Sequence, residues 1–406
     1  MRIWILPLCA LFACSSPPAE PPPVTEAAPA AITRENFLEP AHIRESLQGM
    51  DRILATRVVP RSGPAYELLP PTEPFEVTYE IEGASRGLED LMAATDGTGL
   101  LILHGDKILH EGYGLGAGPK TLLMSMSVGK SFTSTLIGLA RADGKLASFD
   151  DPVTRYLPEL AGTGYDGVAI RHILDMSSGL DFNETYEWGD ESDAYRLLRA
   201  AIDQKETFAE VARSFGRKAE PGSKFEYVSN NTQILGMLLA RVTGTSLSSY
   251  MAQRLWGPLG AESDARWIVD REGEDGVEMA FGGFNSTLRD YGRFGLLMAY
   301  EGRWRGKQLL PEGWVAEATV PHDSQVDYGK LYPDYPLGYG YQWWCFPGPD
   351  HAFTAQGIHG QFIMVNPVLD LVVVKTSAWP VPWDDAKERE TYALFHAVEE
   401  RLQAGS

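Results

Sequence analysis

The sequence predicts an α+β fold, in which helices cover one antiparallel sheet built from both ends of the chain and a helical lobe is inserted in the middle. Strand-like hairpins lie near both ends, at about 98–115 and 361–378. The residues between them are mainly helical in pattern, most clearly at about 146–275. The two hairpins are therefore expected to be neighbours in space although they are far apart along the chain.

Each predicted hairpin consists of two apolar runs around a turn. In the first, GLLILHG and ILHEGYG flank Gly105-Asp106-Lys107, and in the second, QFIMVN and DLVVVKTSA flank Pro367-Val368-Leu369. Glycine, aspartate and proline favour turns, and short apolar runs bounded by such residues favour strands. A helix at about 385–403 is expected to close the chain.

The first long helix is expected to begin at Ser127. The segment from Met126 to Ala142 contains no proline, and its apolar residues recur at helical spacing, at Val128, Phe132, Leu136 and Leu139. Further helical segments follow, with Gly and Pro between them: IRHILDM, DAYRLLRAAI, NTQILGMLLARVTG, LSSYMAQRLWGPLG and LRDYGRFGLLMAYEG.

Residues 1–13 are predicted to be a lipoprotein signal peptide. Arg2 supplies a positive charge, and Ile3–Phe12 form an apolar run that is too short to span a membrane. The run ends in LFAC, which resembles the lipobox of bacterial lipoproteins, so Cys14 would be lipidated and become the mature N-terminus. Ser15 in place of Asp would permit transfer to the outer membrane. We expect a lipid-anchored, periplasm-facing envelope protein, with an ordinary secretory signal as the alternative.

The body of the protein is predicted to begin after a tether. Residues 14–32 are rich in Pro and Ala and cannot form a core, so 33–406 would be the globular domain. Cys9 lies in the segment that would be removed. Once Cys14 is lipidated, Cys345 is the one remaining thiol, and no internal disulfide is expected.

The composition excludes several partners. A formal net charge of −20 argues against nucleic acid and anionic membrane surfaces, so membrane contact is expected only through the lipid anchor. The eight His residues show no metal-ligand spacing, and we expect neither a metal nor another cofactor.

Residues 125–132, SMSVGKSF, match parts of three motifs. GKS ends a phosphate-binding P-loop, but Met124 stands where that loop needs its first Gly. SMSVG is close to the G-x-S-x-G nucleophile elbow, but Ser125 replaces the first Gly and alternating parallel βα units are not visible. SVGK, from Ser127 to Lys130, is an S-x-x-K pair, and it is the interpretation that the rest of the chain favours.

An S-x-x-K pair makes chemical sense at the start of a helix. Residues three apart share a helix face, so the Lys130 side chain can reach the Ser127 hydroxyl. The helix N-terminus places positive potential near a developing oxyanion. A buried lysine can have a lowered pKa and act as a base, although a solvated surface lysine is the alternative when this motif stands alone.

Two later segments extend the pattern. EPGSKFEYVSNNTQILG (220–236) puts Tyr227 in a turn just before a helix, and GIHGQFIMVNP (357–367) puts a Gly-flanked turn before a strand. With SVGK, they have the order and spacing of the three motifs of serine β-lactamases and penicillin-binding proteins. From about 75 to 400 the chain resembles the β-lactamase-related serine hydrolases, with the layout of class C β-lactamases. The sequences of its motifs are most similar to those of the 6-aminohexanoate-dimer (nylon-oligomer) hydrolase branch. The resemblance implies the two-lobed fold of this family.

The resemblance also implies residue roles. Ser127 would be the nucleophile that forms an acyl-enzyme, and Lys130 the base that takes its proton. Tyr227 would pass a proton to the leaving group and later help to activate water. The backbone amides of Ser127 and Gln361 would form the oxyanion hole, since Gln361 follows the Gly that ends the third motif.

The chain departs from the family pattern at two motifs. Ser229 stands where many members have an Asn that bonds the lysine or the substrate. Ile358-His359-Gly360 replaces K-T-G, so the lysine that would pair with the carboxylate of a β-lactam is missing. This difference favours esters or small amides, and His359 would be a hydrogen-bonding or packing residue.

The loop SSGLDFNETYEW holds further candidates for substrate contact. Four polar or aromatic side chains in it could reach the site, Asp181, Glu184, Tyr186 and Trp188. A solvated loop is the alternative for each of them. Together with Ser229 and His359, they complete the predicted substrate-binding set.

The expected function is therefore a serine hydrolase that uses a Ser–Lys–Tyr acyl-enzyme mechanism. Carboxylic esters are the first expected substrate class, and small amides or linear 6-aminohexanoate-like oligomers the second. A β-lactamase or D-alanyl carboxypeptidase is an alternative that the missing lysine disfavours. An inactive penicillin-binding-like envelope protein is another, which the presence of Ser127, Lys130 and Tyr227 disfavours.

Overall fold

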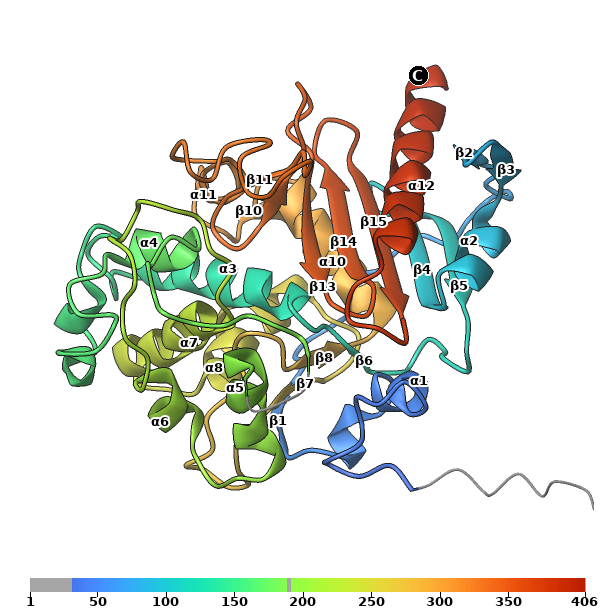
Figure 1. Ribbon diagram of the computed structural model, residues 1–406. Coiled ribbons are helices and arrows are strands. Elements are labelled where there is room, and N and C mark those ends of the chain that lie inside the picture. The colour runs from blue at the N-terminus through green and yellow to red at the C-terminus, as the bar shows by residue number, and fades with distance from the viewer. Residues whose placement is uncertain (1–30, 188–190, 406) are drawn as a thin grey trace, which may run out of the picture. The chain divides into compact units, whose positions relative to one another are not determined.

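Figure 1 shows the computed structural model, which describes residues 31–187 and 191–405 of the 406-residue chain. The chain divides into two compact units, Met1–Ala31 and Ile32–Ser406, and every described helix and strand belongs to the second. The predicted signal peptide, Cys14, nearly all of the predicted tether and Trp188 lie outside the described residues.

The main sheet joins the two ends of the chain, as the sequence predicts. Its strands have the order β11-β12-β13-β14-β15-β4-β5, and every neighbouring pair is antiparallel. Their bounds are Gly97–His104 (β4), Lys107–Tyr113 (β5), Gly338–Tyr339 (β11), Trp344–Cys345 (β12), Phe353–Gly357 (β13), Gln361–Asn366 (β14) and Leu371–Ser377 (β15). Because β15 lies beside β4, with Val373 opposite Ile102, the two predicted hairpins are adjacent (Figure 1).

The helices surround the sheet and form the lobe beside it (Figure 1). In chain order they are α1 (Ile43–Ser46), α2 (Leu88–Ala94), α3 (Val128–Ala142), α4 (Ile170–Leu174), α5 (Asp193–Ile202), α6 (Phe208–Ala212), α7 (Ser229–Thr243), α8 (Leu247–Met251), α9 (Gly257–Leu259), α10 (Leu288–Ala299), α11 (Trp314–Ala318) and α12 (Asp385–Ala404). Turns of 3-10 helix lie at Met50–Arg52, Val153–Arg155 and Pro158–Leu160, and a π-helical stretch, Ala252–Trp256, joins α8 to α9. The predicted helical range of 146–275 thus reaches too far, because a strand begins at Ala265.

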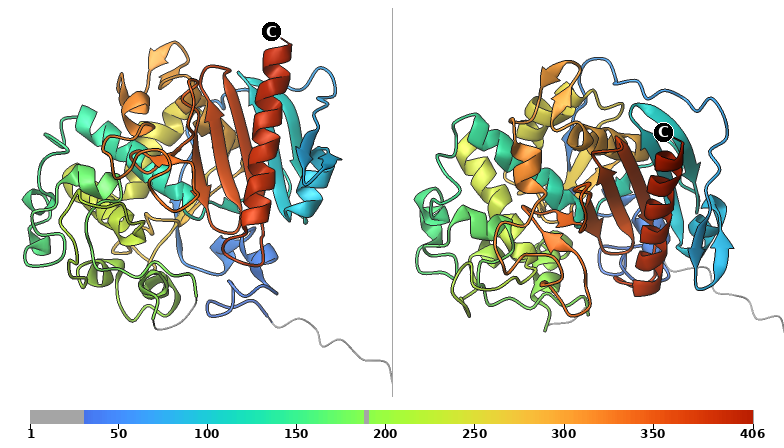
Figure 2. Two further views of the ribbon diagram at one scale, coloured as in Figure 1. Left: turned by 45° about the horizontal axis from the view of Figure 1, so that its top comes forward. Right: turned by 90° about the horizontal axis from the view of Figure 1, so that it is seen from above.

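Helices cover both faces of the main sheet. On one face, Gly295 of α10 packs against Val372 of β15, and on the other, Tyr392 of α12 contacts Phe362 of β14. Figure 2 shows α12 lying along the sheet. Since neither face meets solvent, β4 and β15 are continuous apolar runs in the sequence rather than alternating ones.

A second antiparallel sheet, which the sequence did not predict, brings the N-terminal segment close to the start of α3. Its order is β1-β7-β8-β6, with bounds Thr56–Val59, Ala265–Ile268, Phe284–Ser286 and Leu123–Met124. The backbone N–H of Met124 also donates to the carbonyl of Leu47 (2.9 Å), just after α1. Two short hairpins complete the fold, β2 (Tyr79–Ile81) with β3 (Ala84–Arg86), and β9 (Arg303–Trp304) with β10 (Lys307–Gln308).

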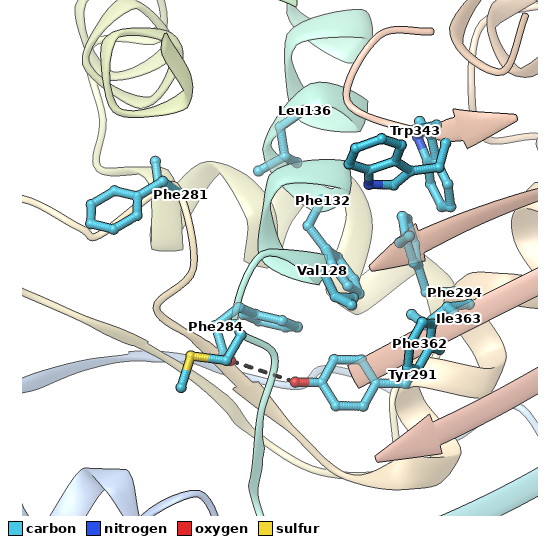
Figure 3. Packing of buried hydrophobic residues seen from close by; sticks show 14 of the residues in the cluster. Val128, Phe132, Leu136, Phe281, Phe284, Tyr291, Phe294, Trp343, Phe362 and Ile363 are labelled. Carbon is cyan, nitrogen blue, oxygen red and sulfur yellow. Dashed lines mark hydrogen bonds between the residues drawn. The ribbon is translucent and has the colours of Figure 1, made fainter. Parts of the chain in front are cut away.

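Buried aromatic side chains fix the first turns of α3 (Figure 3). Phe132 stacks on Phe294 of α10, with ring centroids 3.8 Å apart, and meets the ring of Phe284 in β8 at 4.6 Å. The hydroxyl of Tyr291 donates to the carbonyl of Leu123 (2.7 Å). Because these contacts join α3 to α10 and to the second sheet, the start of α3 is held from several sides.

Two further observations concern the described residues as a whole. No helix among them is long and apolar enough to cross a membrane, and no cluster of three His, Cys, Asp or Glu side chains could hold a metal ion. The one cysteine within them, Cys345, is buried, and burial raises the pKa of its thiol, so it is a packing residue rather than a reactive one.

Candidate active site

Ser127 lies where strand β6 turns into helix α3. Met126, just before it, has a φ of +45°, a left-handed conformation that non-glycine residues rarely adopt. Ser125 holds this turn through its N–H, which donates to the carbonyl of Phe284 (2.7 Å), and through its hydroxyl, which donates to that of Met126 (2.9 Å). The hydroxyl of Ser127 does not cap the helix but is hydrogen-bonded to Lys130.

Lys130 is buried, and its amine meets three oxygen atoms. Its Nζ lies 2.8 Å from Ser127 Oγ, and it donates to the carbonyl of Phe281 (2.8 Å) and to Ser229 Oγ (3.1 Å). Burial lowers the pKa of Lys130 to about 7, and the negative charge of Glu184 opposes that shift. A substantial fraction of neutral amine is thus available near neutral pH to take the proton of Ser127.

Tyr227 stands on the other side of the nucleophile, two residues before α7. Desolvation raises the pKa of its phenol, and a hydrogen bond with Ser127 opposes the shift. Its ring stacks on Trp344 at 5.7 Å, and the Nζ of Lys130 lies 5.0 Å from the ring centroid. The phenol therefore stays protonated and is placed to donate a proton beside Ser127 Oγ.

Glu184 is connected to Lys130 through Ser229. The backbone N–H and hydroxyl of Ser229 both donate to the Glu184 carboxylate, at 2.7 and 2.6 Å, and the hydroxyl of Tyr186 donates to it at 3.0 Å. Burial raises the pKa of Glu184, while Lys130 and these hydrogen bonds oppose that rise. Ser229, where the family often has Asn, thus holds the lysine and the carboxylate in one network.

Two cavities meet at Ser127. The first, called the apolar cavity below, is lined by Phe37, Leu38, Met124, Met126, Ser127, Tyr186, Ala194, Leu198, Ser229, Met279, Phe281, Gly282 and Ile358. The second, called the aromatic cavity, is lined by Ser127, Tyr186, Tyr227, Tyr332, Tyr335, Trp344, Gln356, Gly357, Ile358 and Trp383. A substrate whose scissile bond lies at Ser127 can therefore place one part in each cavity.

Three predicted substrate contacts line neither cavity. Asp181 is exposed, and the carboxylate of Glu184, in the same loop, is bonded to Ser229 and Tyr186 instead. His359 is fully buried in the turn between β13 and β14, where Nδ1–H donates to the carbonyl of Trp379 (2.7 Å). Burial lowers the pKa of His359 to about 4, so it is a neutral packing residue rather than a substrate contact.

The structure favours a different second amide for the predicted oxyanion hole. Gln361 lines neither cavity, and its side chain is engaged with the backbone of the following strand region. Gly357 lies against the nucleophile instead, since a Cβ there would be 2.9 Å from the amide nitrogen of Ser127. Within the described backbone, neither the amide of Ser127 nor that of Ile358 donates to another backbone group. The amide of Ile358, before the turn rather than after it, is therefore the better partner.

Comparisons with known proteins identify the family. A family model described as Beta-lactamase matches residues 85–397. A 6-aminohexanoate-dimer hydrolase from Paenarthrobacter ureafaciens is 32% identical over 362 residues, which cover 86% of this chain and 89% of that protein. The chain belongs to the β-lactamase family. It is a serine hydrolase of that family, and a β-lactamase from Escherichia coli K12 is 29% identical over a shorter stretch of 141 residues, or 34% of this chain and 33% of that protein.

Solved structures show the same β-lactamase and penicillin-binding-protein fold. A Bacillus anthracis protein provisionally named a 6-aminohexanoate-dimer hydrolase matches with a TM-score of 0.82 and 20% identity, over 94% of this chain and 99% of that one. A penicillin-binding protein from Bacillus halodurans matches with a TM-score of 0.58 and 19% identity, over 77% and 99%. The predicted two-lobed fold is confirmed.

Several residues of this β-lactamase-family site were missed by reasoning from the sequence. Ile358 lies within the segment GIHGQ, and Trp344 within YGYQWW. Both segments carry the family resemblance, so the sequence could have indicated both residues. For Phe37 and Leu38 there was no such signal, because they precede residues 85–397, which match the family model. They reach the site only through the fold of the N-terminal segment.

Proposed function

We propose that this serine hydrolase cleaves small carboxylic esters, with Ser127, Lys130 and Tyr227 as its catalytic residues. The observation that carries the proposal is the placement of Ser127 Oγ between a buried amine at 2.8 Å and a protonated phenol. The neutral amine can accept a proton, and the phenol can supply one. No further side chain is needed for the proton transfers of acyl transfer.

In the acylation step, neutral Lys130 takes the proton of Ser127 as Oγ attacks the ester carbonyl carbon. The negative charge on the carbonyl oxygen is stabilised by the amides of Ser127 and Ile358. When the ester C–O bond breaks, Tyr227 gives its proton to the leaving alkoxide and regains one from the Lys130 ammonium. The products are the free alcohol and an acyl group bound to Ser127.

In the deacylation step, a water molecule attacks the acyl carbon from the side that the alcohol has left. Neutral Lys130 takes the phenol proton of Tyr227 as the phenol oxygen takes one from this water, and the same two amides stabilise the second oxyanion. The bond to Ser127 Oγ then breaks, and Oγ recovers its proton from the Lys130–Tyr227 pair. The carboxylic acid leaves, and the starting state is restored.

The charges around the site support esters over β-lactams. No Lys or Arg occurs among the described residues that line either cavity, so the carboxylate of a penicillin would lack a cationic partner there. Small amides are the second candidate class, because the 32% identical relative is a 6-aminohexanoate-dimer hydrolase. Tyr227 can protonate an amine leaving group as well as an alkoxide.

A substrate panel tests this proposal. The purified protein is treated with a fluorophosphonate probe and assayed with p-nitrophenyl esters, nitrocefin and 6-aminohexanoate dimer, with Ser127→Ala as the control. We expect labelling and ester turnover that the control lacks. Nitrocefin turnover far above ester turnover would overturn the substrate class, and ester turnover retained in the control would overturn the mechanism.

We also propose a location for the protein, from its first residues alone. The LFAC sequence ending at Cys14 and the Pro/Ala-rich stretch after it support a lipid-anchored envelope protein that faces the periplasm. The tether would hold the catalytic body at a short distance from the membrane surface.

A further inference from the structure

The apolar cavity beside Ser127 is closed by a segment that lies outside the family-matched residues 85–397. Phe37 and Leu38 form part of its wall, and their side chains are only 1% and 9% exposed. A segment that precedes the family-model match therefore completes the cavity.

The segment that carries Phe37 and Leu38 is fixed to the site by long-range contacts. The carbonyl of Leu47 accepts the backbone N–H of Met124 (2.9 Å), three residues before Ser127. The side chains of Arg44 and Gln48 both donate to the carbonyl of Leu115, at 3.0 and 3.2 Å.

The same segment continues into strand β1, which pairs with β7 and places Thr56 opposite Ile268. Since β7 and β8 also pair, and β8 holds the turn before Ser127, the segment and the nucleophile share one small sheet. A substitution at Phe37 or Leu38 will thus change the cavity wall next to a fixed reacting centre.

The position of Tyr227 decides which part of the substrate each cavity holds. Tyr227 lines the aromatic cavity and is absent from the described lining of the apolar one. Because Tyr227 protonates the leaving group, the alcohol part of the ester belongs in the aromatic cavity. The acyl part then extends from Ser127 into the apolar cavity.

The lining of the apolar cavity selects uncharged acyl groups. No charged side chain occurs among its described lining residues. Its two hydroxyl-bearing side chains besides Ser127, those of Tyr186 and Ser229, both donate to the Glu184 carboxylate. An ammonium or carboxylate at the far end of an acyl chain would lose its water there without gaining a partner.

We propose that the apolar cavity binds the acyl chain of the substrate, and that Phe37 and Leu38 set the length of chain that fits. The substrate class is then esters of unbranched, uncharged alkanoic acids, and acyl groups with a terminal charge are poor substrates. This inference rests on the proposed ester hydrolysis and adds the identity of the acyl group to it.

The test measures how kcat/KM depends on the length of the acyl chain, for the full-length protein and its variants. Values of kcat/KM are measured for p-nitrophenyl esters from acetate to decanoate, and for p-nitrophenyl 6-aminohexanoate beside the hexanoate, which lacks only the ammonium. The variants are Phe37→Ala and Leu38→Ala, which enlarge the cavity, and Phe37→Trp, which narrows it. Tyr332→Ala, in the wall of the aromatic cavity, is the matched control.

We expect the wild-type protein to prefer the hexanoate over the 6-aminohexanoate by at least about 100-fold, because a hydrophobic pocket strongly rejects a charged group. The two alanine variants should move the optimum to longer chains and Phe37→Trp to shorter ones, each by about two carbons. Tyr332→Ala alters the cavity for the alcohol part, so it should change kcat/KM for all chain lengths by a similar factor and leave the position of the optimum unchanged.

The outcomes separate this inference from the proposed function. If the wild-type protein hydrolyses no ester, the proposed function fails and this inference falls with it. If esters are hydrolysed but all variants keep the wild-type chain profile, only the role of Phe37 and Leu38 is overturned. If 6-aminohexanoate and hexanoate esters react equally well, the selection against charge is overturned. A variant that has lost p-nitrophenyl acetate turnover is replaced by Phe37→Leu or Leu38→Val, which preserve most of the packing.

Discussion

The Nζ atom of Lys130 lies 2.8 Å from the Oγ atom of Ser127, and no acidic side chain forms an ion pair with that Nζ in the described part of the chain. The hydroxyl of Ser229 lies between Lys130 and the Glu184 carboxylate and is hydrogen-bonded to both. This separation lets burial keep the pKa of Lys130 near 7 rather than at the value of a surface lysine. A lysine so placed is a base for Ser127.

Lys130→Met should abolish most of the activity while preserving the fold. Methionine fills similar space without an amine, so loss of the base is expected to lower kcat for p-nitrophenyl hexanoate by about 10³-fold. Thermal unfolding should show a melting temperature no lower than that of the wild type, because the substitution removes a buried amine. Activity within a few-fold of the wild type would show that another group takes the proton.

The pH profile should report the titration of Lys130. Since the neutral amine is the base, kcat/KM should fall about tenfold per unit below a pH of about 7 and level off above it. Glu184 raises the pKa of Lys130, so Glu184→Gln removes that effect and should move the acid limb to lower pH. An acid limb that stays in place or moves upward in Glu184→Gln would contradict the proposed coupling.

Tyr227→Phe should affect poor leaving groups more than good ones. The phenol protonates the departing alkoxide, and p-nitrophenolate needs little such help. We expect a loss of about 10²- to 10³-fold for an ethyl ester and a clearly smaller loss for the p-nitrophenyl ester of the same acid. Equal losses for both esters, measured under the same conditions, would mean that Tyr227 does not act on the leaving group.

Gly357→Ala should disturb the oxyanion hole. A Cβ at this position would lie 2.7 Å from the carbonyl oxygen of Ser125 and 2.9 Å from the amide nitrogen of Ser127. The backbone must move, and kcat is expected to fall by about 10²- to 10³-fold. Gly118→Ala is the control, because nothing lies within 4 Å of its added Cβ. Comparable activity of the two variants would argue against a position for Gly357 and Ile358 beside the oxyanion hole.

Cys14→Ala should release the protein from the membrane. Without the thiol no lipid can be attached, so the protein is expected in the soluble fraction of a Gram-negative host and should no longer incorporate an alkyne-labelled fatty acid. Unchanged fractionation and labelling in Cys14→Ala would refute lipidation at this residue.

The sequence predicted those parts of the fold that depend on the pattern of apolar and polar residues within one short segment. The buried runs of β4 and β15 exclude solvent on both faces, so their sequences are continuous and apolar and mark the sheet clearly. The proximity of Ser127 and Lys130 follows from a spacing of three on one helix. The position of Tyr227 followed from family resemblance, because nothing local ties a residue before α7 to the start of α3.

The parts that the sequence did not predict depend on contacts between distant segments. The structure favours the amide of Ile358 over that of Gln361 as the second oxyanion donor. The turn between these two residues contains His359 at a φ of +60°, and the motif alone does not show which side of the turn faces the site. Asp181 and Glu184 are both acidic residues of one loop, and only tertiary packing selects which of them is buried. Phe37 reaches the site because its segment is held by long-range contacts, among them the hydrogen bond from Met124 to Leu47 and the pairing of β1 with β7, which no local pattern reveals.

Rapid-quench mass spectrometry with p-nitrophenyl hexanoate tests the central claim most directly. Acylation of an activated ester is fast, so an acyl-enzyme should accumulate as a burst of p-nitrophenolate is released. The account predicts a hexanoyl group on the peptide that contains Ser127, absent from Ser127→Ala together with the burst. A hexanoyl group on another residue, or steady ester turnover by Ser127→Ala, would contradict it.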